Sequence, residues 1–200
     1  MALWPTLPFH PEETLLSYAD RVSMLHTGRG MERVVRDFGI DTEHFTSGRE
    51  EAVARFAAAV GLPEEDMKRA SIRVFQRGAS FRSEDISKTF LGPRAARYCP
   101  SCLAEDGQGG DRRFRFIWGF RHVVRCDRHS TWLIDAPRMN EANLRLAIGT
   151  EMLGETKAAA TGMPGYLRWL RRRLDGRSRT DNHWICAIRP QNRFLLRLKC

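Results

Sequence analysis

The sequence has no long hydrophobic run. Among its 200 residues, no apolar stretch approaches the roughly 20 residues that a membrane-spanning helix needs, so no membrane association is expected. The start, Met-Ala-Leu-Trp-Pro, lacks the basic region and apolar core of a secretory signal. We expect a protein of the bacterial cytoplasm, whose reducing conditions keep cysteines available as metal-binding thiolates.

Catalytic signatures are missing as well. The sequence contains no H-E-x-x-H motif, no nucleophile elbow, no phosphate-binding loop and no convincing cluster of carboxylates. These absences argue against the common hydrolases and nucleotide-driven enzymes. We therefore expect a protein without catalytic activity.

What the sequence does contain is a pair of metal-binding knuckles. Cys99-Pro-Ser-Cys102 is followed, after 23 residues, by Cys126-Asp-Arg-His129. Three thiolates and one imidazole at this spacing are typical of a closed structural zinc site, so we predict one structural Zn²⁺ ion. A chance grouping of buried thiols and a surface histidine is the alternative. Cys186 and Cys200 receive no role.

A closed site leaves no position for water or substrate, so the metal is expected to organise structure rather than catalyse hydrolysis. Three thiolates and a divalent cation leave one net negative charge. Arg97, Arg125 and Arg128 flank the knuckles and could offset it, or could be solvated surface charges.

Positive charge is concentrated in the second half of the chain. The net charge is +9, residues 1–98 carry 14 basic and 14 acidic side chains, and residues 99–200 carry 19 basic and 10 acidic ones. Most of the excess basic residues are arginines, and a guanidinium group can pair with phosphate oxygens through two hydrogen bonds, so we predict a DNA partner. A solvated basic face without a partner is the alternative. The predicted nucleic-acid contacts are Arg73, Arg77, Arg112, Arg113, Arg115, Arg121, Arg168, Arg171 and Arg172.

The first half reads as helical. Residues 11–13 are predicted to form the first turn of a helix that Gly28 ends, and a second helix is predicted over 31–38. The apolar stripe of the first helix comprises Leu15, Leu16, Ala19, Val22 and Leu25.

Residues 49–70 follow a helix-turn-helix pattern, with the turn at Gly61-Leu62. The second helix begins with Glu64-Glu65-Asp66, whose carboxylates would repel phosphate, so an ordinary helical hairpin stays open. The predicted inward residues are Val53, Phe56, Ala57, Val60, Met67 and Ala70.

The segment 114–121 alternates aromatic and other residues, which predicts a strand. It is expected to pair with 132–134 as a small zinc ribbon. Its rings fit the miniature core of that ribbon better than a platform for stacking unpaired bases.

The predicted fold is mainly α with a small zinc ribbon. We divide it into a helical, helix-turn-helix-like domain (1–90), a zinc-ribbon module (91–139) and a basic C-terminal helical region (140–200). Helices are predicted over 140–153 and 164–174, and no prediction is made for 177–200.

Several strings together resemble the TniQ family of transposon target-selection proteins. They are Leu7-Pro8 through Glu13, Leu15-Leu16-Ser17-Tyr18 with Arg21, Tyr98-Cys99-Pro-x-Cys102-Leu103-x-Glu105-Asp106, Phe114-Arg115, Trp118, and Val124-x-Cys126-x-x-His129 with Leu133. The match covers about residues 3–135.

The resemblance implies a non-catalytic, DNA-binding partner in transposition. Such a protein marks the target and recruits an AAA+ regulator and a transposase, in some systems while docked on an RNA-guided CRISPR complex. The family's zinc ligands fall on Cys99, Cys102, Cys126 and His129. Many relatives carry a further C-P-x-C after the ribbon, which residues 135–139 lack, so a second metal site is not expected. A homodimer is left open, as is a protein-interaction module with little DNA affinity of its own.

Overall fold

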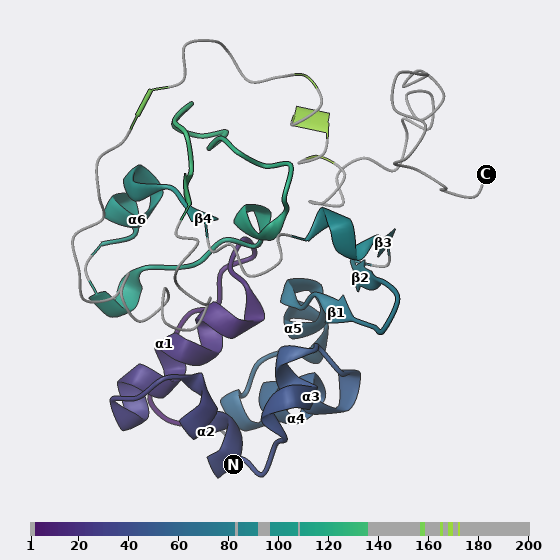
Figure 1. Ribbon diagram of the computed structural model, residues 1–200. Helices are drawn as coiled ribbons and strands as arrows, with labels where there is room; N and C mark the ends of the chain where they lie inside the picture. The colour runs from purple at the N-terminus through teal and green to yellow at the C-terminus, as the bar shows by residue number, and fades with distance from the viewer. Residues whose placement is uncertain are drawn as a thin grey trace.

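The computed structural model describes residues 3–82, 84–91, 97–107, 109–135, 157–158, 165, 168–169 and 172 (Figure 1). This part of the chain combines helices with two small antiparallel sheets. Within it, no helix is long and apolar enough to cross a membrane. The predicted helix 140–153 and residues 177–200 lie outside the described residues. In the predicted helix 164–174, the four described residues are helical.

Five helices build an N-terminal helical body: α1 (Leu15–Thr27), α2 (Met31–Asp37), α3 (Thr42–Thr46), α4 (Glu50–Val60) and α5 (Glu64–Ala70). Figure 1 shows them gathered around the start of the chain, away from α6 and β4. They enclose one hydrophobic core centred on Tyr18, Phe45, Phe56 and Met67, each fully buried. Edge-to-face and tilted ring contacts link the aromatic members, with Phe45 and Phe56 centroids 4.8 Å apart.

The first helix starts later than predicted. Residues 11–13 are not its first turn, because the Thr14 side chain accepts the Ser17 N–H at 3.1 Å and caps the helix there. Gly28 ends the helix in the left-handed conformation, with φ 66°, as predicted. Leu25 was expected in the core and is 48% exposed, so the apolar stripe leaves the core before the last turn.

The helices of 49–70 are confirmed. α4 ends at Gly61, whose φ is 72°, and Pro63 precedes α5. All six predicted inward side chains are buried.

The short helix α3 was not predicted from the sequence. Its N-cap Asp41 accepts the His44 N–H at 2.8 Å, and its Phe45 enters the core.

Two small sheets follow. β1 (Arg73–Val74), β2 (Ala79–Phe81) and β3 (Glu84–Ile86) form an unpredicted antiparallel sheet in that order. β4 (Arg97–Tyr98) pairs with β5 (Ile134–Asp135). These two strands enclose residues 97–135, here called the metal-binding segment after the four predicted ligands that it contains. The segment also contains α6 (Pro100–Asp106) and the short 3₁₀ helices η2 (Gly109–Asp111) and η3 (Phe116–Gly119); η1 (Lys88–Phe90) precedes it.

The predicted strand over 114–121 is wrong. The chain curls into η3, where the Trp118 N–H donates to the Arg115 carbonyl, and it makes only isolated bridges on either side. The rings nevertheless form the miniature core, as predicted, because a curled segment surrounds so small a volume better than a flat strand. Trp132 pairs with Arg125 instead of with 114–121. The core of this second body includes Phe81, Leu103, Phe114, Phe116, Trp118, Phe120 and Val123.

Backbone hydrogen bonds between residues 12–14 and residues 114–116, here called the strap, join the two bodies. The Thr14 N–H donates to the Phe114 carbonyl at 3.0 Å, and the Phe116 N–H donates to the Glu12 carbonyl at 3.0 Å. From α1, Arg21 donates to the Gly110 carbonyl and, at 2.8 Å, to the buried carboxylate of Glu13. The metal-binding segment is therefore held directly against the start of α1.

Candidate metal centre and nucleic-acid interface

The four predicted metal ligands come together in one buried cluster. The side-chain donor atoms of Cys99, Cys102, Cys126 and His129 all lie within 4.8 Å of one another. Cys99 is the N-cap of α6 and Cys102 lies in its first turn, so the first knuckle is the entry of a helix that Pro100 starts. The second knuckle lies in the turn between Arg125 and Trp132.

The spacing of the donor atoms fits a tetrahedral ion. Bond lengths of about 2.3 Å to sulfur and about 2.0 Å to nitrogen place two sulfurs about 3.8 Å apart and a sulfur and a nitrogen about 3.5 Å apart. The Cys102 and Cys126 sulfurs are 3.5 Å apart, and Nδ1 of His129 lies 3.3 to 3.6 Å from the three sulfurs. These separations are close to those of a tetrahedral site, so the donor set can hold one metal ion.

The outer side of His129 is also occupied. Its Nε2 lies 2.7 Å from Oε1 of Glu105 on α6, so Nε2–H can donate to the carboxylate while Nδ1 faces the sulfurs. Metal-bound histidines commonly have such a carboxylate partner, which fixes the ring. The sequence reading missed Glu105, although its position three residues after Cys102 on a helix was an available signal.

Hydrogen bonds also tune the sulfurs. The Thr131 hydroxyl lies 3.5 Å from the Cys99 sulfur and can donate to it. Hydrogen bonds from Cys102 and Cys126 lower the pKa of the Cys99 thiol. The hydrogen bonds that Cys102 makes with Cys126 and Cys99 raise the pKa of Cys102, because one thiolate is stabilised by its neighbours' protons. A cluster whose own hydrogen bonds stabilise a thiolate is suited to binding a cation.

The three arginines flanking the knuckles have separate partners. Arg97 donates to the Arg121 carbonyl at 2.7 Å, and Arg128 pairs with Glu105 at 2.9 Å. Arg125 is buried, with its guanidinium 5.6 Å from the centre of the Trp132 ring. Arg128 and Glu105 thus extend the metal centre to the surface.

The predicted nucleic-acid contacts are scattered. Arg77 and Arg121 are exposed, while Arg73 is ion-paired with Glu50. Arg168 and Arg172 are exposed helical residues, and Arg171 lies outside the described residues. Arg112 is half-buried and donates to the Gly107 carbonyl.

Arg113 and Arg115 share one buried acid. Both pair with Oδ1 of Asp106, whose side chain is only 1% exposed. Arg115 is itself 6% exposed, which takes it off the open surface where the sequence reading had placed it. The sequence reading also missed Asp106, and the acid run of Glu105-Asp106 beside the knuckle was the available signal.

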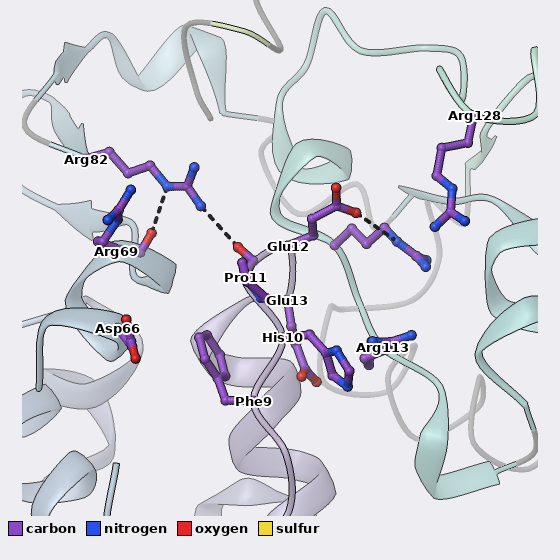
Figure 2. Close-up of a pocket in the computed structure, with 11 residues that line it drawn as sticks. Phe9, His10, Pro11, Glu12, Glu13, Asp66, Arg69, Arg82, Arg113 and Arg128 are labelled. Atoms are coloured by element: carbon purple, nitrogen blue, oxygen red, sulfur yellow. Dashed lines mark hydrogen bonds and ion pairs between the residues drawn. The ribbon is translucent and has the colours of Figure 1, made fainter. Parts of the chain in front are cut away.

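A cleft of about 630 Å³ opens beside these residues, between the helical body and the metal-binding segment. Figure 2 shows Arg69 and Arg82 on one side of the segment from His10 to Glu12, and Arg113 and Arg128 on the other. Glu13 also lines the cleft, and burial raises its pKa to about 7, against the opposing effects of Arg21 and Ser17.

The comparison with known families agrees with this geometry. The model of the TniQ family matches residues 5–133, which includes both knuckles, Glu105 and the strap to α1. The chain belongs to the TniQ family. TniQ proteins are non-catalytic adaptors with a role in target selection for transposition, and they work within complexes that contain protein and DNA. No match is found among curated proteins.

Proposed function

We propose that this TniQ protein is a zinc-stabilised, DNA-binding adaptor that selects or marks the target site in transposition and recruits the AAA+ regulator and the transposase. A CRISPR complex is its further partner in systems that have one. The observation that carries the proposal is the closed cluster of four donors fastened to α1, because a closed site shapes a surface and leaves no reactive position.

Zinc is the metal that suits this donor set. Three sulfurs and one imidazole nitrogen at tetrahedral spacing favour Zn²⁺ over Mg²⁺ or Ca²⁺, which prefer oxygen ligands. The small core around the cluster is enclosed by short strands and 3₁₀ turns, and elements this short need a cross-link to hold their arrangement. A zinc ion bound by the four side chains would supply that cross-link.

DNA binding is supported by arginines on several surfaces of the chain. Arg77 on the loop between β1 and β2 is exposed, as are Arg121, Arg168 and Arg172. α4 and α5 would serve as the helix-turn-helix, with exposed Arg69 near the end of α5. Backbone phosphates rather than base edges are the expected partners of these side chains.

One observation favours the alternative of a protein-interaction module. The first turn of α5 carries Glu64, Glu65 and Asp66, and all three residues are exposed. Carboxylates at the end that would enter a groove repel phosphate and suit a basic protein surface better.

Two measurements test the proposal. Metal analysis of purified protein should find one zinc per chain, and binding to a short duplex should weaken steeply with salt. No binding even at low salt would establish the interaction module instead.

A reconstituted insertion reaction tests the role in targeting. Omitting the protein should abolish site-directed insertion while the transposase keeps its strand chemistry. Insertion that stays site-directed without the protein would overturn the proposal, as would DNA cleavage by the purified protein alone.

A further inference from the structure

The cleft between the two bodies is lined by more basic than acidic side chains. Five guanidinium groups line it, against three carboxylates. Of the carboxylates, Glu13 is paired with Arg21. Three of the arginines also have acidic partners outside the lining, since Arg113 and Arg115 pair with Asp106 and Arg128 pairs with Glu105. Burial and the charges of Arg113 and Arg21 lower the pKa of His10, so this histidine adds no positive charge near neutral pH and the arginines alone set the sign.

The two walls come from different parts of the fold. Arg69 lies in the last turn of α5, and Arg82 follows β2. Arg113, Arg115 and Arg128 belong to the metal-binding segment, and the segment from Phe9 to Glu13 lies between the walls (Figure 2). The cleft therefore exists only when both bodies are folded and strapped together.

Arg82 is held in place before any ligand arrives. Its guanidinium donates to the carbonyls of Arg69 and Pro11, each at 3.1 Å, and lies 4.5 Å from the centre of the Phe116 ring. These contacts fix the planar guanidinium group of Arg82 at the cleft, so this side chain would lose less conformational entropy on binding a ligand.

Arg115 has unused hydrogen-bonding capacity. Its Nη2 is taken by Asp106, and its Nε lies 3.7 Å from Glu12. Its Nη1 is buried and has no hydrogen-bond partner among the described residues. A buried donor without a partner is unfavourable, but this atom is shielded from solvent, so Arg115 contributes charge to the wall rather than a direct contact.

We propose that this cleft binds backbone phosphates of a nucleic-acid strand, with Arg69 and Arg82 on one wall and Arg128 on the other as the principal contacts. The inference deepens the proposed function, on whose DNA binding it rests. It assigns the contact to the junction of the two bodies, whereas the sequence reading had placed it on separate exposed arginines.

Phosphate is the chemistry that suits these side chains best. Guanidinium groups donate charge-assisted hydrogen bonds to phosphate oxygens, and five of them line this cleft. Among the described lining residues, the one phenylalanine, tyrosine or tryptophan ring is that of Phe9, which packs against Tyr18 at 5.3 Å and is therefore not an open platform for a base. The cleft is therefore suited to the strand's backbone and not to its sequence.

The test compares salt-dependent binding of duplex DNA, measured by fluorescence anisotropy, for the wild type and two variants from opposite walls, Arg69→Gln and Arg128→Gln. The matched control is Arg55→Gln, which removes an exposed arginine from α4 outside the cleft. Zinc content and thermal unfolding of each variant verify that the fold is intact. Single-stranded DNA, RNA and a poly-aspartate competitor are measured in parallel.

Each cleft variant should weaken binding severalfold and lower the salt slope by about 1, whereas the control should leave the slope near the wild-type value. Wild-type slopes in both folded cleft variants would overturn the inference and leave the proposed function standing. Competition by poly-aspartate as strong as that of DNA would also overturn it, because the cleft would then recognise carboxylates. Failure of the wild type to bind any nucleic acid at low salt would instead reject the proposed DNA binding itself.

Discussion

The two hydrophobic bodies of this TniQ protein are built in different ways. The N-terminal helical body buries large side chains between five helices, and its elements cap themselves, as Thr14 and Asp41 do. The second body has one helix of seven residues, strands of two or three residues and short 3₁₀ turns. Its compactness comes from aromatic rings around a cluster of three cysteines and a histidine. A metal ion can replace regular secondary structure as the source of order in a small core.

Removing a metal ligand should separate the two bodies most strongly. We expect Cys126→Ser to lose the bound zinc and to melt the second core, because structural zinc contributes on the order of 10 kcal/mol in small modules. The helical signal of α1–α5 in far-ultraviolet circular dichroism should largely persist. Metal analysis and near-ultraviolet dichroism of the buried tryptophan provide the measurement.

Cys186→Ser is the matched control, since it removes a cysteine that is not among the four predicted ligands. It should retain one zinc per chain. A Cys126→Ser protein that keeps its tertiary dichroism without metal would show that the second body does not need the ion.

The complementary change lies in the first core. Phe56 is fully buried among Tyr18, Phe38 and Phe45, so Phe56→Ala should cost about 3–5 kcal/mol of unfolding free energy. The zinc content should stay at one per chain, because no ligand comes from this core. Phe75→Ala, at a half-exposed ring on the β1–β2 loop, is the control and should cost far less. Loss of zinc in Phe56→Ala would mean that the bodies fold as one unit.

The contrast between the bodies also explains what could be predicted from the sequence. The helices of 49–70 were predictable because Val53, Phe56 and Val60 recur at helical spacing and Gly61 marks the stop. The clustering of Cys99, Cys102, Cys126 and His129 was predictable because paired knuckles have few other uses. Both signals are local in sequence.

The failures concern long-range packing. The alternation over 114–121 correctly identified buried rings, but it could not show that the chain curls around them or that Arg115 faces buried Asp106. The sheet β1–β3 has strands too short to leave a periodic pattern. The cleft joins residues from the N-terminal segment, α5 and the second body, and no sequence spacing reports such a meeting.

A tight seam between the turn that joins α3 to α4 and residues 71–73 contains a glycine that a side chain cannot replace. Gly48 has φ 70°, and an added Cβ would lie 2.5 Å from the Ser71 hydroxyl and 2.7 Å from the Ile72 carbonyl. Gly48→Ala should cost on the order of 3 kcal/mol, from backbone strain and overpacking together. Gly39→Ala separates the two causes, because Gly39 has φ 67° with nothing near its Cβ position, and should cost about 1 kcal/mol. Equal denaturation midpoints for the two variants would show that the seam yields at no cost.

The smallest expected effect is a pH dependence located at Glu13, beside the backbone hydrogen bonds that join the two bodies. Burial raises the pKa of Glu13 to about 7, whereas the unfolded chain has the ordinary value of 4.5. The folded state therefore holds a proton that the unfolded state has released, and stability falls as pH rises through 7. Between pH 6 and pH 8 the loss should be about 1.4 kcal/mol.

Glu13→Gln removes the titrating group, so its unfolding free energy should lack this part of the pH dependence, although it weakens the partner of Arg21 at every pH. Denaturant unfolding at saturating zinc between pH 6 and pH 8 provides the measurement, with Glu51→Gln on the exposed face of α4 as the control that keeps the wild-type slope. The difference in slope, rather than the difference in stability at one pH, isolates the proton. If wild type and Glu13→Gln change in parallel, Arg21 keeps Glu13 ionised throughout, and Glu13 and Arg21 form a permanent ion pair.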